Sequence, residues 1–136
     1  MACHKLLTAK AGILFYSLIL FLCRQARTDN MKVQHHSFDL PFVYPFTISK
    51  GTKTVQPIFI AELDFNGIKG YGEAPAISYY NFPVEKMAAD LEAKKTLVEK
   101  YALIDAERYW HYLHHLFPQN PFLVCALDIA AWDITV

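Results

Sequence analysis

The chain has 136 residues, which is enough for one domain with a single ordinary hydrophobic core. Hydrophobic residues make up 54% of the chain and charged residues 19%, a balance typical of a folded protein. Thirteen basic side chains balance thirteen acidic ones, so the clustered basic excess of a nucleic-acid-binding surface is lacking and no nucleic-acid partner is expected.

The first thirty residues differ in character from the rest. Residues 11–23 form an apolar run, AGILFYSLILFLC, with Lys5 and Lys10 before it. Thirteen apolar residues are short for a spanning helix, but they suit a signal peptide or an anchor. Two other interpretations remain open: the natural start is Met31, or the run is a packed helix. A start at Met31 implies a cytoplasmic protein, and a signal or anchor implies a membrane-bound or secreted one.

Three strands are expected after Met31. The first covers residues 32–40 and enters a proline-rich segment, LPFVYPFTISKGTKT, in which Pro41, Pro45 and Gly51 argue against continuous regular structure. Residues 55–65 are rich in β-branched and aromatic side chains and predict the second strand. Asn66-Gly67 then predicts a tight hairpin turn, with the third strand over residues 68–74.

Three helices are expected next. Pro83 opens the first, Asp105 caps the second, and Asn120-Pro121 begins the third. The predicted apolar face of the second helix holds Ala106, Trp110, Leu113 and Phe117, and that of the third holds Phe122, Cys125, Ala126 and Ile129. Cys125 is accordingly expected to be buried, and no disulfide or CxxC zinc site is expected from the three cysteines. Strands followed by helices indicate the α+β class, here a three-stranded antiparallel meander and a helical segment. The third helix has no stop signal, so the chain is expected to end within an element.

Few side chains form a pattern that would indicate a catalytic, metal-binding or phosphate-binding site. His111, His114 and His115 form an HxxHH pattern without the glutamate of a zinc hydrolase, which favours a solvated or interfacial helix face. His35 and His36 are adjacent on a strand and should point to opposite faces. The glycines of GxxGYGEA, residues 67–74, indicate close backbone packing rather than a phosphate loop. Glu73, beside them, either orients a neighbouring loop or faces a ligand. No active site is evident from these residues.

Three segments in order resemble the N-terminal domain of the enolase superfamily, in the muconate cycloisomerase and dipeptide epimerase branch. They are the strand from Met31 running into LPFVYPFTISKGTKT, the hairpin FNGIKGYGEAPAISYY, and the helix CALDIAAWDI. The resemblance spans residues 31–134 and leaves out the first thirty, which favours Met31 as the natural start. It divides the chain into an apolar leader, residues 1–30, and an enolase-like capping domain, residues 31–134.

The resemblance implies a cap over a catalytic (β/α) barrel that this chain does not contain. In such enzymes lysines in the barrel move the proton α to a carboxylate, and Mg²⁺ held by acidic residues stabilises the enolate. The partners implied are the missing barrel and a small dipeptide or carboxylate substrate. Association of copies of the chain into a homo-oligomer is a further alternative. The chain alone is expected to hold no metal and to be inactive.

Two substrate loops are implied by the resemblance. The first comprises Phe46, Thr47, Ile48, Ser49 and Lys50, and the second comprises Ile77, Ser78, Tyr79 and Tyr80. Lys50 or Lys53 is expected to meet a substrate carboxylate. The function expected is that of a dipeptide epimerase cap. The alternatives are the cap of a muconate cycloisomerase or o-succinylbenzoate synthase, or a non-enzymatic tethered or secreted module.

Overall fold

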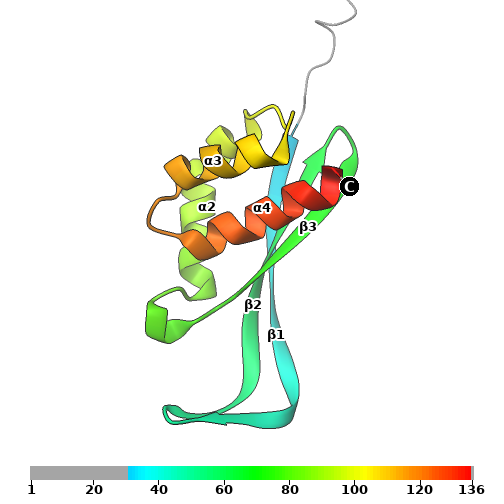
Figure 1. The fold of residues 1–136 in the computed structure, drawn as a ribbon. Coiled ribbons are helices and arrows are strands. Elements are labelled where there is room, and N and C mark those ends of the chain that lie inside the picture. The colour runs from blue at the N-terminus through cyan, green and yellow to red at the C-terminus, as the bar shows by residue number, and fades with distance from the viewer. Residues whose placement is uncertain (1–30, 136) are drawn as a thin grey trace, which may run out of the picture.

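A computed structural model describes residues 31–135, in which a sheet is followed by helices (Figure 1). The elements are β1 (Met31–Ile48), β2 (Gly51–Phe65), β3 (Ile68–Pro75), the 3₁₀ helix η1 (Ser78–Tyr80), α2 (Val84–Glu99), α3 (Ala106–Leu116) and α4 (Pro121–Thr135). This order confirms the predicted α+β class. The interpretations of residues 1–30 lie outside the described residues. None of the helices described is both long and apolar enough to cross a membrane.

The sheet is an antiparallel meander in the order β1-β2-β3. The turn between β2 and β3 has Asn66 at a φ of 56° and Gly67 at 87°, which confirms the hairpin predicted from Asn-Gly. The backbone N–H of Gly67 also donates to Asp64 Oδ1 at 2.9 Å, so a side chain of β2 helps to close the turn.

The β1–β2 hairpin continues well beyond the body of the domain and forms a projecting arm, residues 40–54 (Figure 1). The prediction of irregular structure over residues 40–54 is therefore wrong for most of that segment. The two strands pair at Pro41 with Val55 and again from Phe46 with Lys53 to Ile48 with Gly51. The interruption between Pro41 and Phe46 contains Pro45, whose missing N–H cannot contribute to the ladder. The sheet thus accommodates the prolines by an irregularity in register.

One face of the sheet packs against the helices, and α4 lies closest to β3. A Cβ atom at Gly72 would lie 1.9 Å from the carbonyl oxygen of Ala126, and one at Gly70 would lie 2.2 Å from that of Ala130. These glycines therefore let the α4 backbone approach β3 to a distance that no side chain would permit. The prediction of close backbone packing in this segment is confirmed.

The predicted helix starts are confirmed. Pro83 is the N-cap of α2, and the Asp105 side chain accepts from the N–H of Glu107 at 2.9 Å to cap α3. The Asn120 side chain accepts from the N–H of Leu123 at 3.1 Å and donates to Asp90 Oδ2 at 2.8 Å. Asn120 therefore caps α4 and joins it to α2.

The predicted faces of two helices need correction. On α3, Tyr109 is fully buried, whereas Trp110 is 39% exposed. On α4, only Ala126 of the predicted stripe is buried, and Cys125 and Ile129 are exposed. The buried residues of α4 are Leu123, Val124, Ala126, Leu127, Ala130 and Ala131. Because almost every α4 side chain is apolar, its hydrophobic pattern does not indicate which side faces the sheet.

Two helix carboxylates bind the outer strands of the sheet. The N–H of Val33 in β1 donates to Glu99 Oε1 at 3.2 Å, and the N–H of Tyr71 in β3 donates to Asp133 Oδ2 at 2.9 Å. Each bond satisfies a backbone donor on an edge strand that has no neighbouring strand to receive it.

Candidate functional site

The two predicted substrate loops approach each other below the helices. The first occupies the tip of the arm, at the end of β1 and in the turn that follows, and the second forms η1 (Figure 1). Lys50 Nζ lies 4.7 Å from the centroid of the Tyr79 ring, a cation–π contact between the two loops. The arm thus curves back to contact the second loop.

A second connection lies at the base of the arm. The side-chain amide of Gln56 donates to the carbonyl oxygens of Pro57 and Ala76, each at 2.8 Å. The N–H of Ala76 donates to the Pro57 carbonyl at 2.9 Å. Gln56 therefore ties β2 to the segment that leads into the second loop. Sequence reasoning missed this role, because nothing local distinguishes Gln56 from an ordinary strand residue.

A recess of about 220 Å³ opens between the arm, the second loop and the start of α2. Its lining residues are Lys53, Val55, Pro57, Ala76, Ser78, Pro83, Val84 and Glu85. Lys53 is half-buried and Glu85 is exposed, and no ion pair with another described residue engages either. The recess therefore offers an ammonium group from the arm and a carboxylate from the first turn of α2.

A second recess lies on the β1 side of Pro57. It measures about 260 Å³ and is lined by Ser37, Phe38, Asp39, Pro57, Val84 and Glu85. Pro57, Val84 and Glu85 are common to both recesses, so the two share a wall.

The second loop has a defined shape. Ile77 pairs with Phe82 in an isolated antiparallel bridge, and Asn81 closes the turn with a φ of 61°. The Tyr79 and Tyr80 rings lie 4.3 Å apart, and both are more than half exposed. The tyrosines therefore form an exposed aromatic surface that the turn holds in place.

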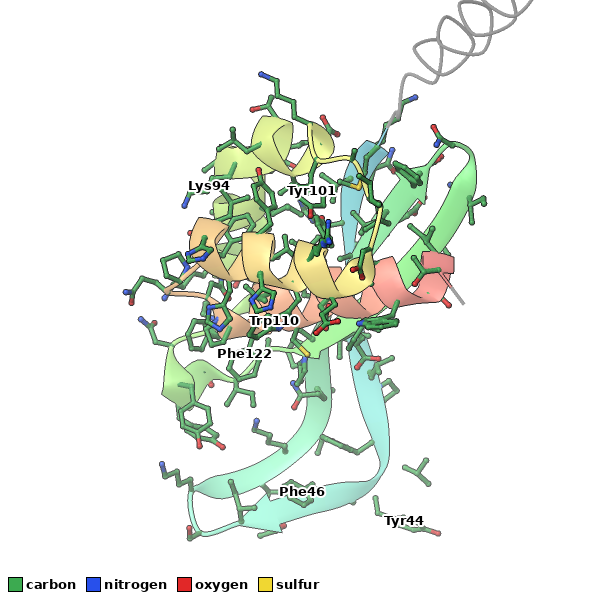
Figure 2. The ribbon with its side chains drawn as sticks, turned by 45° about the horizontal axis from the view of Figure 1, so that its top comes forward. Tyr44, Phe46, Lys94, Tyr101, Trp110 and Phe122 are labelled. Atoms are coloured by element: carbon green, nitrogen blue, oxygen red, sulfur yellow. The ribbon has the colours of Figure 1, made fainter. Side chains whose placement is uncertain are left out.

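The remaining predicted site residues lie apart from the recess. Phe46 and Tyr44 lie at the outer end of the arm, and Phe46 contacts the ring of Phe42 (Figure 2). The Thr47 hydroxyl lies 3.0 Å from that of Thr52 across the arm. Glu73 is exposed and pairs in register with Ile60 in β2. The structure thus brings Lys50 to Tyr79 and places Lys53 and Ser78 in the lining of one recess, while these other residues line neither recess.

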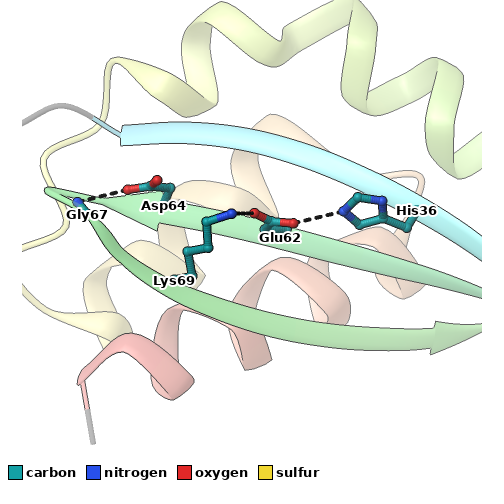
Figure 3. Close-up of polar contacts among 5 residues, drawn as sticks. All are labelled: His36, Glu62, Asp64, Gly67 and Lys69. Carbon is teal, nitrogen blue, oxygen red and sulfur yellow. Dashed lines mark hydrogen bonds and ion pairs between the residues drawn. The ribbon is translucent and has the colours of Figure 1, made fainter.

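A charged cluster on the other face of the sheet was not predicted (Figure 3). Glu62 is only 7% exposed, and its carboxylate lies 2.6 Å from Lys69 Nζ and 2.8 Å from His36 Nε2. The hydrogen bonds from Lys69 and His36 lower the pKa of the Glu62 carboxyl, and the bond to Glu62 raises the pKa of Lys69. The Asn-Gly turn could have revealed this pair, because its register puts Glu62 and Lys69 on one face of the hairpin.

The histidine predictions agree with the structure. His36 contacts Glu62, whereas His35 stacks on Phe59 at 5.5 Å between ring centroids, so the two point to opposite faces of the sheet. His111, His114 and His115 are exposed, which confirms a solvated helix face. No group of three or more metal-ligating side chains that could hold an ion occurs within residues 31–135.

The chain is similar in sequence to curated epimerases. It is 34% identical over 104 residues to the L-Ala-D/L-amino acid epimerase of Flavobacterium johnsoniae, an alignment that covers 76% of this chain and 31% of that protein. The chain therefore spans about a third of the length of this relative. No family profile matches the chain.

Solved structures share the fold. A dipeptide epimerase from Methylococcus capsulatus, complexed with Mg and the dipeptide L-Arg-D-Lys, has a TM-score of 0.69 at 20% identity, over 78% of this chain and 31% of that one. The muconate lactonizing enzyme from Pseudomonas fluorescens has a TM-score of 0.71 at 18% identity, over 79% and 31%. The chain therefore has the fold of the matching third of these enzymes, and in sequence it is similar to curated L-Ala-D/L-amino acid epimerases.

Proposed function

We propose that residues 31–135 act as the substrate-selecting cap of a dipeptide epimerase, in cooperation with a catalytic barrel. The supporting observation is that the arm and the second predicted loop both contribute to one recess, through Lys53 of the arm and Ser78 of η1. A recess built from the arm and a separate loop can be reshaped without disturbing the core, which suits a surface that discriminates among substrates.

The chemistry proposed for the whole enzyme is proton removal and return at the carbon α to a carboxylate. A bound Mg²⁺ would stabilise the negative charge that develops on that carboxylate. The described residues do not fit such an ion, since no group of three or more ligating side chains is close enough to hold one. We therefore assign the metal and the proton-transferring groups to the barrel, and the chain alone is expected to be inactive.

Lys53 is the cation proposed to meet a substrate carboxylate. Lys50 already lies over the Tyr79 ring, whereas Lys53 lines the recess without an ion pair to any described residue. Glu85 lines the same recess. A dipeptide carries both an ammonium and a carboxylate group, so the two opposite charges suit a zwitterionic substrate.

A chimera tests the proposal. Residues 31–135 would replace the matching segment of the Flavobacterium johnsoniae epimerase, and deuterium uptake at the α-carbon of L-Ala-D/L-amino acid dipeptides would be followed by NMR. We expect exchange in the chimera, with a changed order of preferred dipeptides, and no exchange in the isolated chain. A chimera that folds, as judged by circular dichroism, but exchanges no proton would contradict the proposal.

Two matched variants of the chimera separate the lysines. Lys53→Ala should raise KM for dipeptides about tenfold, because one charge-assisted contact is lost, and should change kcat little. Lys50→Ala should have a smaller effect on KM. Equal KM values for the two variants and the parent chimera would exclude Lys53 from substrate binding while leaving the cap proposal intact.

A further inference from the structure

The histidines of α3 lie outside the site described above and have no role in the proposed function. His111, His114 and His115 are all exposed, and no hydrogen bond or ion pair with another described residue engages them. Their imidazole nitrogens are therefore available to a ligand from solution.

The spacing of His111 and His115 is suited to chelation. Residues four apart on a helix have Cβ atoms roughly 5–6 Å apart on the same face, and this spacing lets two imidazoles bind one metal ion. The absence of an HExxH glutamate removes the general base of a zinc hydrolase, but chelation does not need that base. Both residues lie inside the regular helix α3, so its backbone holds the pair in place.

His111 and His115 would be the two protein ligands of such an ion, and His115 lies in the last turn of α3. Because no third side chain within the described residues completes a metal site, water would fill the remaining positions of the ion. Imidazole ligands with water favour Cu²⁺, Ni²⁺ and Zn²⁺ over Mg²⁺.

We propose that His111 and His115 form a surface chelate for a divalent transition-metal ion of the Cu²⁺, Ni²⁺ and Zn²⁺ class. The site is separate from the recess and does not depend on the proposed function. Trp110 is a reporter beside the site, because its ring centroid lies 4.9 Å from that of the proposed ligand His111. The same ring also lies 4.8 Å from that of His114, which is not one of the proposed ligands.

The test is a Cu²⁺ titration of the full chain carrying Trp132→Phe, which leaves Trp110 as its only tryptophan. We expect saturable quenching of Trp110 fluorescence, reversed by EDTA. His111→Ala and His115→Ala should each raise the apparent Kd by about tenfold or more, since each removes one of two protein ligands. His114→Ala, the matched control on the same turn, should change it by less than about threefold.

Two outcomes would overturn the proposal. If quenching is unchanged in both His111→Ala and His115→Ala, Cu²⁺ binds elsewhere on the chain. If His114→Ala abolishes quenching while His115→Ala does not, the chelating pair is not the one proposed. Circular dichroism of each variant would establish that α3 is intact, and Zn²⁺, which should compete without quenching, would show whether other ions of the class share the site.

Discussion

The hydroxyl groups of two α3 tyrosines should contribute differently to the stability of the fold. The Tyr109 hydroxyl is buried without a hydrogen-bond partner among the described residues, whereas the Tyr112 hydroxyl donates to the Leu97 carbonyl at 2.8 Å. Both rings contact Tyr101. Burial raises the pKa of Tyr109 far above its ordinary value, so this hydroxyl stays neutral.

We expect opposite effects from removing the two hydroxyls. Tyr109→Phe should leave the free energy of unfolding unchanged or raise it by up to about 1 kcal/mol, because it removes an unsatisfied buried donor. Tyr112→Phe should lower it by about 1 kcal/mol, because a hydrogen bond is lost. Urea denaturation would measure both, and a larger loss for Tyr109→Phe than for Tyr112→Phe would show that the Tyr109 hydroxyl has a partner.

Gly72 is expected to be the least replaceable residue of β3. Gly72→Ala would place a methyl group against the backbone of Ala126, so α4 must move and the free energy of unfolding should fall by about 3 kcal/mol or more. Gly67→Asn is the matched control, because a Cβ there meets no atom within 4 Å and asparagine tolerates the positive φ. Similar losses in both variants would contradict the proposed packing role.

At the scale of elements, the arm and the second loop are expected to be mechanically coupled. Lys50→Ala removes the cation–π contact with Tyr79, so the amides of Tyr80, Asn81 and Phe82 should exchange with deuterium a few times faster, as the loss of about 0.5–1 kcal/mol implies. Lys53→Ala, on the same arm but without that contact, should not change these rates. Equal exchange rates in Lys50→Ala and the parent chain would mean that the contact does not hold the loop.

The elements also differ in how well the sequence predicts them. The turn at Asn66-Gly67 and the caps Asp105 and Asn120 are predictable, because each depends on the local chemistry of one or two residues. The faces of α3 and α4 are not, since which side of a helix is buried depends on neighbours distant in sequence. The extension of the arm past Pro41 also escapes prediction, because pairing with β2 overrides the local tendency of proline to end a strand.

The candidate site was predictable in part. The resemblance to known enzymes indicated the two loops, and in the structure Lys50 contacts Tyr79 while Lys53 and Ser78 line the same recess. The roles of Gln56 and Glu85 depend on how the arm curves and where α2 starts, which no local pattern encodes. The substrate roles assigned to the loop residues stay predictions until they are measured in an active enzyme.

At the scale of the whole molecule, the cluster of Glu62, Lys69 and His36 should make the free energy of unfolding depend on pH. The folded-state pKa of Glu62 is lowered, so its stabilising effect is present above the unfolded-state pKa, about 4.3, and is lost as the pH falls through the folded-state value. Glu62→Gln should therefore destabilise the chain near pH 7, and the difference from the parent should shrink steadily below about pH 4.3.

The control for this measurement is Glu73→Gln on β3. Glu73 is exposed and forms no ion pair with a described residue, so its replacement should change the free energy of unfolding by less than about 0.5 kcal/mol throughout the titration. Denaturant midpoints at several pH values would compare the variants. A difference between parent and Glu62→Gln that is constant with pH would refute an electrostatic origin.

The amide of Gln56 also bears on motion. Its side chain bonds to the Pro57 carbonyl within β2 and to the Ala76 carbonyl at the entry to the second loop, so that loop cannot move away from β2 without losing the bond to Ala76. The backbone bond from the Ala76 N–H to the Pro57 carbonyl would still hold the same junction. A substitution of Gln56 should therefore loosen the entry to the second loop without releasing it.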